Sequence, residues 1–223
     1  MAAVVALGAA GAVAFRWTRP PRLGEGGEVP PGLLALERGA EDAYAHALEE
    51  RRGALGEDSA KVADAWNSQR AQLADMGLTD LQLTAMDAAV RDFQRAVGAR
   101  AGALELARAA NALAAPMDGF FRPFLPRAPA GLLTLEYAAR EQVLDARAKD
   151  LARARRSQAA LARAWAELCA RAPQAAGSRA GRDFEAGLAQ LRAAIDAGDV
   201  AALEAAAQRA LAHAGALERE LAQ

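Results

Sequence analysis

Four polar residues on one helical segment have the types and spacing that favour binding chemistry. They are Tyr137, Arg140, Glu141 and Asp145. Residues three or four apart share a helix face, so Tyr137, Arg140 and Glu141 are expected together, as are Glu141 and Asp145. An arginine beside a tyrosine would hold an anionic group. The same residues also suit an intrahelical ion pair and a half-buried tyrosine, which is the commoner use of such a pattern.

A second candidate is the proline-rich loop from Pro116 to Gly131, which holds three of the six phenylalanines. If its aromatic side chains are exposed, they form an amphipathic patch for a protein partner or a membrane surface. If they fold inward, they plug the open end of a helical bundle, which is the interpretation we favour. The candidate interaction residues are Phe120, Phe121, Arg122, Phe124 and Arg127.

No pattern in the chain indicates catalysis, a cofactor or a metal. His46 and His213 are the two histidines and Cys169 is the single cysteine, so neither a disulfide within the chain nor a multi-cysteine metal cluster is expected. The P-loop, the dinucleotide fingerprint and the nucleophile elbow are all missing. We therefore expect a protein without enzymatic activity. Arg171 would lower the pKa of the Cys169 thiol, although a small buried cysteine is the plainer interpretation.

The distribution of proline predicts where helices run. No proline occurs from Gly32 to Ala115 or from Ala130 to Ala170, and proline costs about 3 kcal/mol inside a helix. Apolar residues recur at steps of three and four through both stretches. The sequence therefore predicts an all-α, antiparallel multi-helix bundle built from helical hairpins. Its body, 32–223, divides into halves 32–115 and 132–223, joined by the 116–131 loop.

Turn signals divide these halves further. Turns are expected near Ala101, Asp150 and Asp199, spaced by 49 residues, which favours a repeat of hairpins. The middle turn contains no glycine, so 132–171 is either one helix or a hairpin. A slip in the apolar pattern after Ala146 favours the hairpin.

Helix-end signals are also present. Thr79 and Gln82 have capping-box spacing, and Gly77 suits the left-handed end of the preceding helix. Asp58 or Ser59 is expected to cap another helix. Asn111 and Gln158 are candidates for a buried polar contact between helices, or for exposed positions.

Charge is nearly balanced overall, with a formal net charge of −1, so no long-range field favours nucleic acid. Locally, 140–171 carries eight basic and four acidic residues, whereas 37–58 carries seven acidic and three basic ones. We expect these two segments to lie side by side.

The N-terminus suggests export or tethering. Residues 1–15 contain an uncharged apolar run, typical of a signal peptide or membrane anchor, and 16–31 forms a Pro/Gly-rich spacer. The alternative is a buried or frayed N-terminal helix. Arginines after the run favour keeping that side in the cytoplasm.

The segment from Leu132 to Trp165 resembles uncharacterised bacterial envelope proteins that carry a signal or anchor followed by helical hairpins. Their Leu-acid-Tyr-x-x-Arg-Glu core is matched at Leu135, Glu136, Tyr137, Arg140 and Glu141. Lys149-Asp150 stands where the family usually has Gly-Asp. The resemblance implies an extracytoplasmic location and carries no activity.

These observations favour a non-catalytic scaffold or protein-binding module of a bacterial cell envelope, inner-membrane tethered or periplasmic. A cytoplasmic location is the alternative. Other functions considered are a small-ligand or cofactor-carrying bundle and an enzyme with a dispersed site. A protein partner is expected and nucleic acid is not, and alanine-rich seams are compatible with a homodimer.

Overall fold

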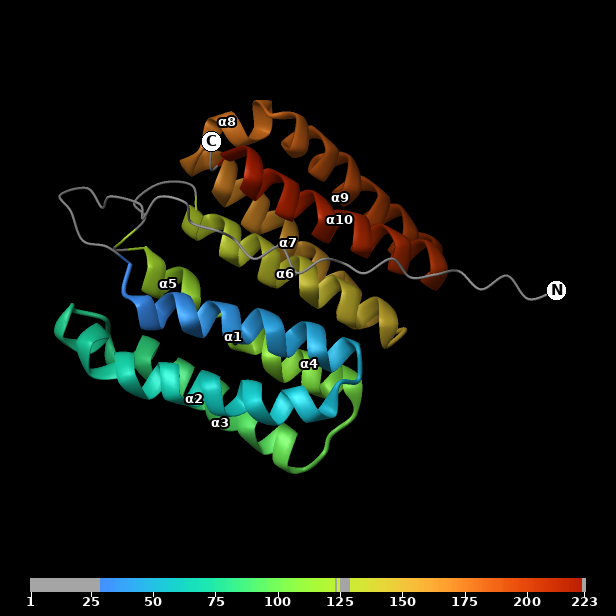
Figure 1. Cartoon of the computed structure of the whole chain (residues 1–223). Coiled ribbons are helices and arrows are strands. Elements are labelled where there is room, and N and C mark those ends of the chain that lie inside the picture. The colour runs from blue at the N-terminus through green and yellow to red at the C-terminus, as the bar shows by residue number, and fades with distance from the viewer. Residues whose placement is uncertain (1–28, 123, 125–128, 222–223) are drawn as a thin grey trace.

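The computed structural model describes residues 29–122, 124 and 129–221, and within these ranges the chain is all-helical (Figure 1). Eight of the helices have ten or more residues and two have five. The apolar segment 1–15 and most of the spacer 16–31 lie outside the described residues. The spacer's last residues are described, and there Val29 is already buried in the core.

The first half forms a four-helix bundle with a short fifth helix. In it, α1 packs on α2 and α4, while α3 packs on α2 and α4. The fifth helix, α5, follows α4 and contributes buried phenylalanines to the same core. These helices are α1 (Pro31–Leu48), α2 (Arg52–Asp75), α3 (Asp80–Gly98), α4 (Ala103–Ala112) and α5 (Met117–Phe121).

The second half repeats this arrangement. Here α6 packs on α7 and α10, while α9 packs on α7 and α10, and α8 joins α7 to α9. Its helices are α6 (Pro129–Arg147), α7 (Leu151–Arg171), α8 (Pro173–Gly177), α9 (Arg179–Ala197) and α10 (Val200–Leu221). The segment 132–171 is therefore a hairpin, as the slip in its apolar pattern predicted.

The two bundles meet along α6. Both α4 and α5 pack against this helix, and Figure 1 shows α6 between the α1–α5 group and the rest of the second bundle. Leu144 of α6 is buried in the core of the first bundle, while Leu135 and Val143 are buried in that of the second. One helix thus presents side chains to both cores.

The hairpin turns share one backbone solution, in which a residue with positive φ ends each helix. These residues are Glu50, Gly77, Arg100, Lys149 and Gly198. In each turn the next N–H donates to the carbonyl five residues earlier, for example Asp150 to Asp145 at 3.0 Å, as in a Schellman motif. The turns expected near residues 101, 150 and 199 are confirmed.

The same spacing relates the two bundles. Glu50 and Lys149 lie 99 positions apart and Arg100 and Gly198 lie 98 apart. The repeat extends to side chains that are buried in both halves. Three pairs of identical buried residues lie 99 positions apart: Leu36 and Leu135, Ala40 and Ala139, and Trp66 and Trp165. The chain is therefore a tandem pair of four-helix units, which explains why its turn signals are periodic.

Helix ends agree with the sequence in most places. Thr79 and Gln82 form the predicted capping box, and Gly77 ends α2 with φ 89°. The expected cap at Asp58 or Ser59 is wrong, because both lie buried inside α2, which begins at Arg52. No helix of the described ranges combines the length and apolar character that a bilayer span requires.

Candidate functional site

Three residues of the polar cluster on α6 lie in one groove between α6 and α7. Tyr137, Glu141 and Asp145 are spaced by four residues, so their side chains follow one face of α6. They line a cavity of about 320 Å³ together with Arg153, Arg156 and Ser157 of α7. Sequence spacing alone predicted the α6 residues but not their partners.

Helix α4 also contacts the carboxylates of the groove, through one arginine. Arg108 donates to Glu141 Oε2 at 3.1 Å and to Asp145 Oδ1 at 2.7 Å. The Asp145 side chain is 1% exposed, so burial without such a partner would be costly. Arg108 therefore forms ion pairs with both carboxylates of α6 and helps to fix their positions.

Helix α7 completes the network from the other side. Ser157 Oγ donates to Asp145 Oδ2 at 2.6 Å, and Arg153 Nε lies 3.3 Å from Asp145 Oδ1. Gln142 donates to Ser157 Oγ at 2.8 Å and to the carbonyl of Ala154 at 2.9 Å. These contacts hold Arg153 and Ser157 at defined positions along α7.

Asn111 is a further buried member, contributed by α4. It donates to Glu141 Oε1 at 2.8 Å and to the Tyr137 carbonyl at 3.2 Å. Of the two alternatives for Asn111, burial is confirmed and exposure is wrong, but its hydrogen bonds go to α6 and not to Gln158 of α7. Its partner is a carboxylate that the sequence could not place beside it.

Together with Arg108, the groove has three arginines for two carboxylates. Both carboxylates are engaged by Arg108 and Arg153, whereas Arg156 forms no ion pair with the described residues. Burial and the nearby Glu141 raise the pKa of Tyr137, so its hydroxyl remains a donor. Arginine, tyrosine and serine donors in one cavity suit an anionic group.

Arg140 points away from the groove towards α1, so the predicted four-residue cluster is split. Its guanidinium lies 2.9 Å from Glu41 of α1 and 3.6 Å from Glu136, and 5.3 Å from the centre of the Tyr44 ring. Arg140 therefore serves the junction between the bundles and takes no part in the groove.

This junction gathers further carboxyl groups. Burial and the neighbouring Glu41 raise the pKa of Glu37 to about 8, and burial and Glu136 raise that of Glu218 of α10 to about 8. Burial also raises the pKa of Glu136. For Arg140, the carboxylates Glu136 and Glu41 outweigh burial, so its pKa is raised. The junction thus gathers several carboxyl groups around Arg140, and Arg219 of α10 also acts on Glu136.

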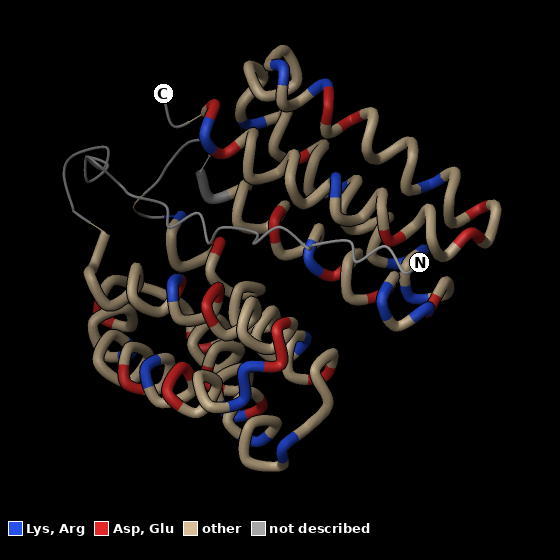
Figure 2. The backbone as a smooth tube through the Cα atoms, turned by 45° about the vertical axis from the view of Figure 1, so that its right-hand side comes forward, with Lys and Arg blue, Asp and Glu red and all other residues tan. Residues whose placement is uncertain are grey.

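The acidic segment 37–58 and the basic segment 140–171 were predicted to lie side by side, and the ion pair that joins them lies in this junction. The ion pair of Arg140 with Glu41 joins them. Helix α7, which carries most of the arginines, packs instead on α6, α8 and α9. Figure 2 shows basic residues gathered around the turn that joins α6 to α7.

The phenylalanines of the proline-rich loop are not an exposed surface. Phe120, Phe121 and Phe124 are buried in the first core, and the Phe120 ring stacks on Trp66 with centroids 5.6 Å apart. Arg122 is exposed and pairs with Asp118 at 2.8 Å, while Arg127 lies outside the described residues. The three phenylalanines therefore pack inward, as the favoured interpretation predicted.

The histidines and the cysteine are dispersed. His46 Nδ1 lies 2.6 Å from Asp58 Oδ2, and in the described ranges no three potential ligands gather as a metal would require. Burial and Glu185 raise the pKa of Cys169. The alternative in which Arg171 lowers this pKa is therefore wrong, and Arg171 instead lies 3.7 Å from Glu167.

Comparison of the chain with protein-family models, curated proteins and solved structures found no match.

Proposed function

We propose that the chain is a non-catalytic helical scaffold that binds an acidic segment of a protein partner in the groove between α6 and α7. The supporting observation is Arg156, which lines the groove without an ion pair in the described part of the chain. The neighbouring carboxylates Glu141 and Asp145 are already neutralised by other arginines. A partner carboxylate would complete the local charge balance.

The charge of α7 supports an acidic partner. Its sequence contains five arginines and one glutamate. The acidic segment of α1 and α2 lies on the first bundle. Among the ion pairs described above, the pair of Glu41 with Arg140 connects it to the basic segment 140–171. Complementary charge accelerates encounter and suppresses wrong partners, and arginine forms bidentate bonds with carboxylates.

The shape of the groove supports recognition of a side chain or chain end instead of a large cofactor. Its cavity of about 320 Å³ is at the small end for ligand sites. In contrast, the interior of the first bundle is filled by large side chains, including Trp66, Phe93 and Phe120.

We further propose that the apolar run 1–15 anchors this module at a bacterial inner membrane or directs its export. The spacer 16–31 would hold the bundles away from the bilayer. Fractionation of cells that express the full chain with a C-terminal tag tests this part. Recovery in the membrane or periplasmic fraction is expected, and recovery in the cytosol alone would remove the envelope location.

The groove is tested by titrating the full chain with a labelled glutamate-rich octapeptide and its glutamine counterpart, followed by fluorescence anisotropy. We expect the glutamate peptide to bind at least about tenfold more tightly, with affinity falling as salt rises. Arg156→Glu should abolish the difference between the two peptides. Arg192→Glu makes the same charge change at an exposed position of α9 and should leave binding intact. Equal binding of both peptides would contradict the proposal.

A further inference from the structure

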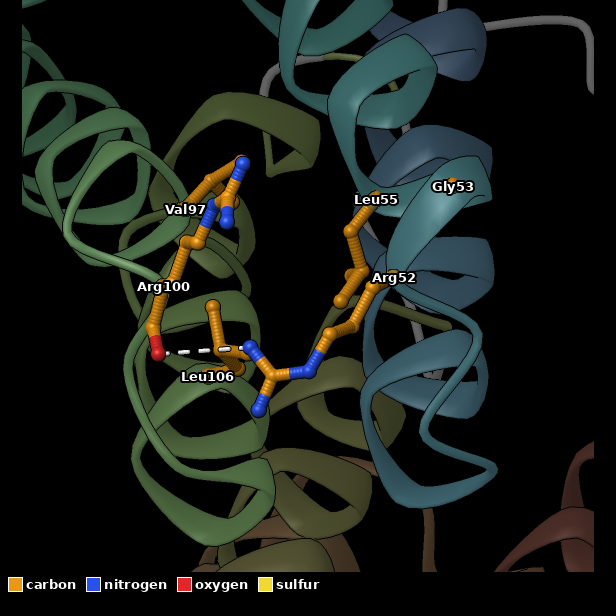
Figure 3. Close-up of a pocket in the computed structure, with 6 residues that line it drawn as sticks. All are labelled: Arg52, Gly53, Leu55, Val97, Arg100 and Leu106. Atoms are coloured by element: carbon orange, nitrogen blue, oxygen red, sulfur yellow. Dashed lines mark hydrogen bonds between the residues drawn. The ribbon is translucent and has the colours of Figure 1, made fainter.

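A second cavity lies in the first bundle, far along the chain from the groove. It has a volume of about 290 Å³ and is lined by residues at the start of α2 and around the α3–α4 turn (Figure 3). The lining residues are Arg52, Gly53, Leu55, Val97, Arg100 and Leu106. We propose that this cavity binds a small amphipathic anion, with an acidic head group and a short apolar tail.

The floor of the cavity is apolar. Leu55 is 2% exposed and Leu106 is 3% exposed, and both belong to the first hydrophobic core. Val97 packs against the same core. In Figure 3 the side chains of Leu55 and Leu106 point into the space between α2 and the α3–α4 turn. A short hydrocarbon tail would replace water against these side chains.

The mouth of the cavity is cationic. Arg52 reaches across from α2 and donates to the carbonyl of Arg100 at 3.2 Å (Figure 3). The side chain of Arg100 extends from the opposite wall. Neither guanidinium forms an ion pair with a carboxylate of the described residues, and the acidic neighbour Glu49 is engaged by Arg51 at 3.4 Å. Two unpaired guanidinium groups at one mouth select an anionic head group.

The second bundle has different residues at the same corner. Arg52 corresponds to Leu151 at an offset of 99, and Arg100 corresponds to Gly198 at an offset of 98. Leu151 packs against the second core. A Cβ atom added to Gly198 would lie 3.8 Å from Leu151 Cδ1, so the leucine covers the turn. In the first bundle both positions are arginines and the corner stays open.

This cavity is separate from the groove between α6 and α7, because the two sites share no residue. Its ligand also differs in chemistry. The groove offers polar and charged walls, whereas this cavity combines an apolar floor with a charged rim. A polar acidic peptide fits the first site and a tailed organic anion fits the second.

The test is a titration of the full chain with hexanoate, monitored by the methyl NMR signals of Leu55, Val97 and Leu106. Saturable shifts of these signals are expected. Hexanol lacks the charge and acetate lacks the tail, so each should bind at least about tenfold more weakly. Hexylammonium reverses the charge and should not bind.

Two sets of variants locate the site. Arg52→Gln and Arg100→Gln should each weaken hexanoate binding by about tenfold, while Arg91→Gln, an exposed change on α3, should not. The double change Arg52→Leu with Arg100→Gly copies the corner of the second bundle. It should remove the saturable shifts without lowering the melting temperature, which shows that folding is retained. Absence of saturable shifts in the wild type, equal binding of hexanol, or wild-type binding by the double variant would each overturn the proposal.

Discussion

The guanidinium of Arg140 in α6 lies 2.9 Å from the carboxylate of Glu41 in α1. These two residues occupy equivalent positions of the tandem repeat, 99 residues apart. Equivalent positions of the two units thus carry opposite charges and meet where the bundles join. Because like charges at such a contact would repel, the difference in charge supports the association of the two units.

Replacement of Arg140 tests the weight of this contact. Arg140→Gln should lower the free energy of unfolding at pH 7 by about 3 kcal/mol, because Glu41 and Glu136 lose the cation that neutralises them at a buried position. The measurement is urea denaturation followed by circular dichroism. Arg91→Gln, an exposed change, should cost less than about 0.5 kcal/mol. Equal effects of the two changes would show that the junction contributes little.

The pH dependence of stability follows from the raised pKa values of Glu37 and Glu218. Both pKa values are about 8 in the folded protein, whereas a glutamate in the unfolded chain has its ordinary pKa of 4.5. Between these values the folded state binds more protons, so the free energy of unfolding falls as pH rises. The contribution is fully present below about pH 4.5 and is lost as pH rises through about 8.

Denaturation at pH 6 and pH 9 checks this dependence, with Glu37→Gln and Glu218→Gln as comparisons. Each variant should flatten the decline, because the amide cannot lose a proton. Glu37 and Glu218 both lie near Glu41, Glu136 and Arg140. The double variant should therefore show the smallest decline in the free energy of unfolding between pH 6 and pH 9. A decline that is unchanged in all the variants would assign the pH dependence to other groups.

Phe120 should act through folding and not through a partner surface. Its ring is fully buried and stacks on Trp66, so Phe120→Ala should destabilise the protein by about 3–5 kcal/mol. Phe120→Leu keeps most of the volume and should cost much less. Thermal unfolding measures both. A stable Phe120→Ala protein that had lost a binding partner would instead indicate an exposed role.

The turn between α6 and α7 is predicted to tolerate glycine. Lys149 has φ 56°, and its counterpart in the last hairpin turn is Gly198. Because glycine adopts this region without a Cβ clash, Lys149→Gly should stabilise the protein by about 0.5–1 kcal/mol. Ala148→Gly, one residue earlier, should not stabilise it. Melting temperatures of the two variants measure these effects. A lower melting temperature for Lys149→Gly would contradict the prediction and indicate that the lysine side chain stabilises the turn.

The sequence by itself determined the helical class and the positions of most turns. Proline exclusion and apolar steps of three and four are local signals, and so is the capping box of Thr79 and Gln82. The hairpin turn at Lys149 could be inferred from a slip in the apolar pattern, although the turn contains no glycine. Such features depend on residues close together in the chain.

Tertiary structure decided which polar residues meet. Tyr137, Arg140 and Glu141 are neighbours on one helix, yet α6 is covered by different helices on its two sides, so Arg140 joins α1 while the others face α4 and α7. Arg108 lies 33 positions before Glu141, and no local pattern indicates that contact. Contacts between residues far apart in the chain depend on how whole helices pack. Burial of the apolar face fixes the position of each helix, and that position determines which charged side chains meet.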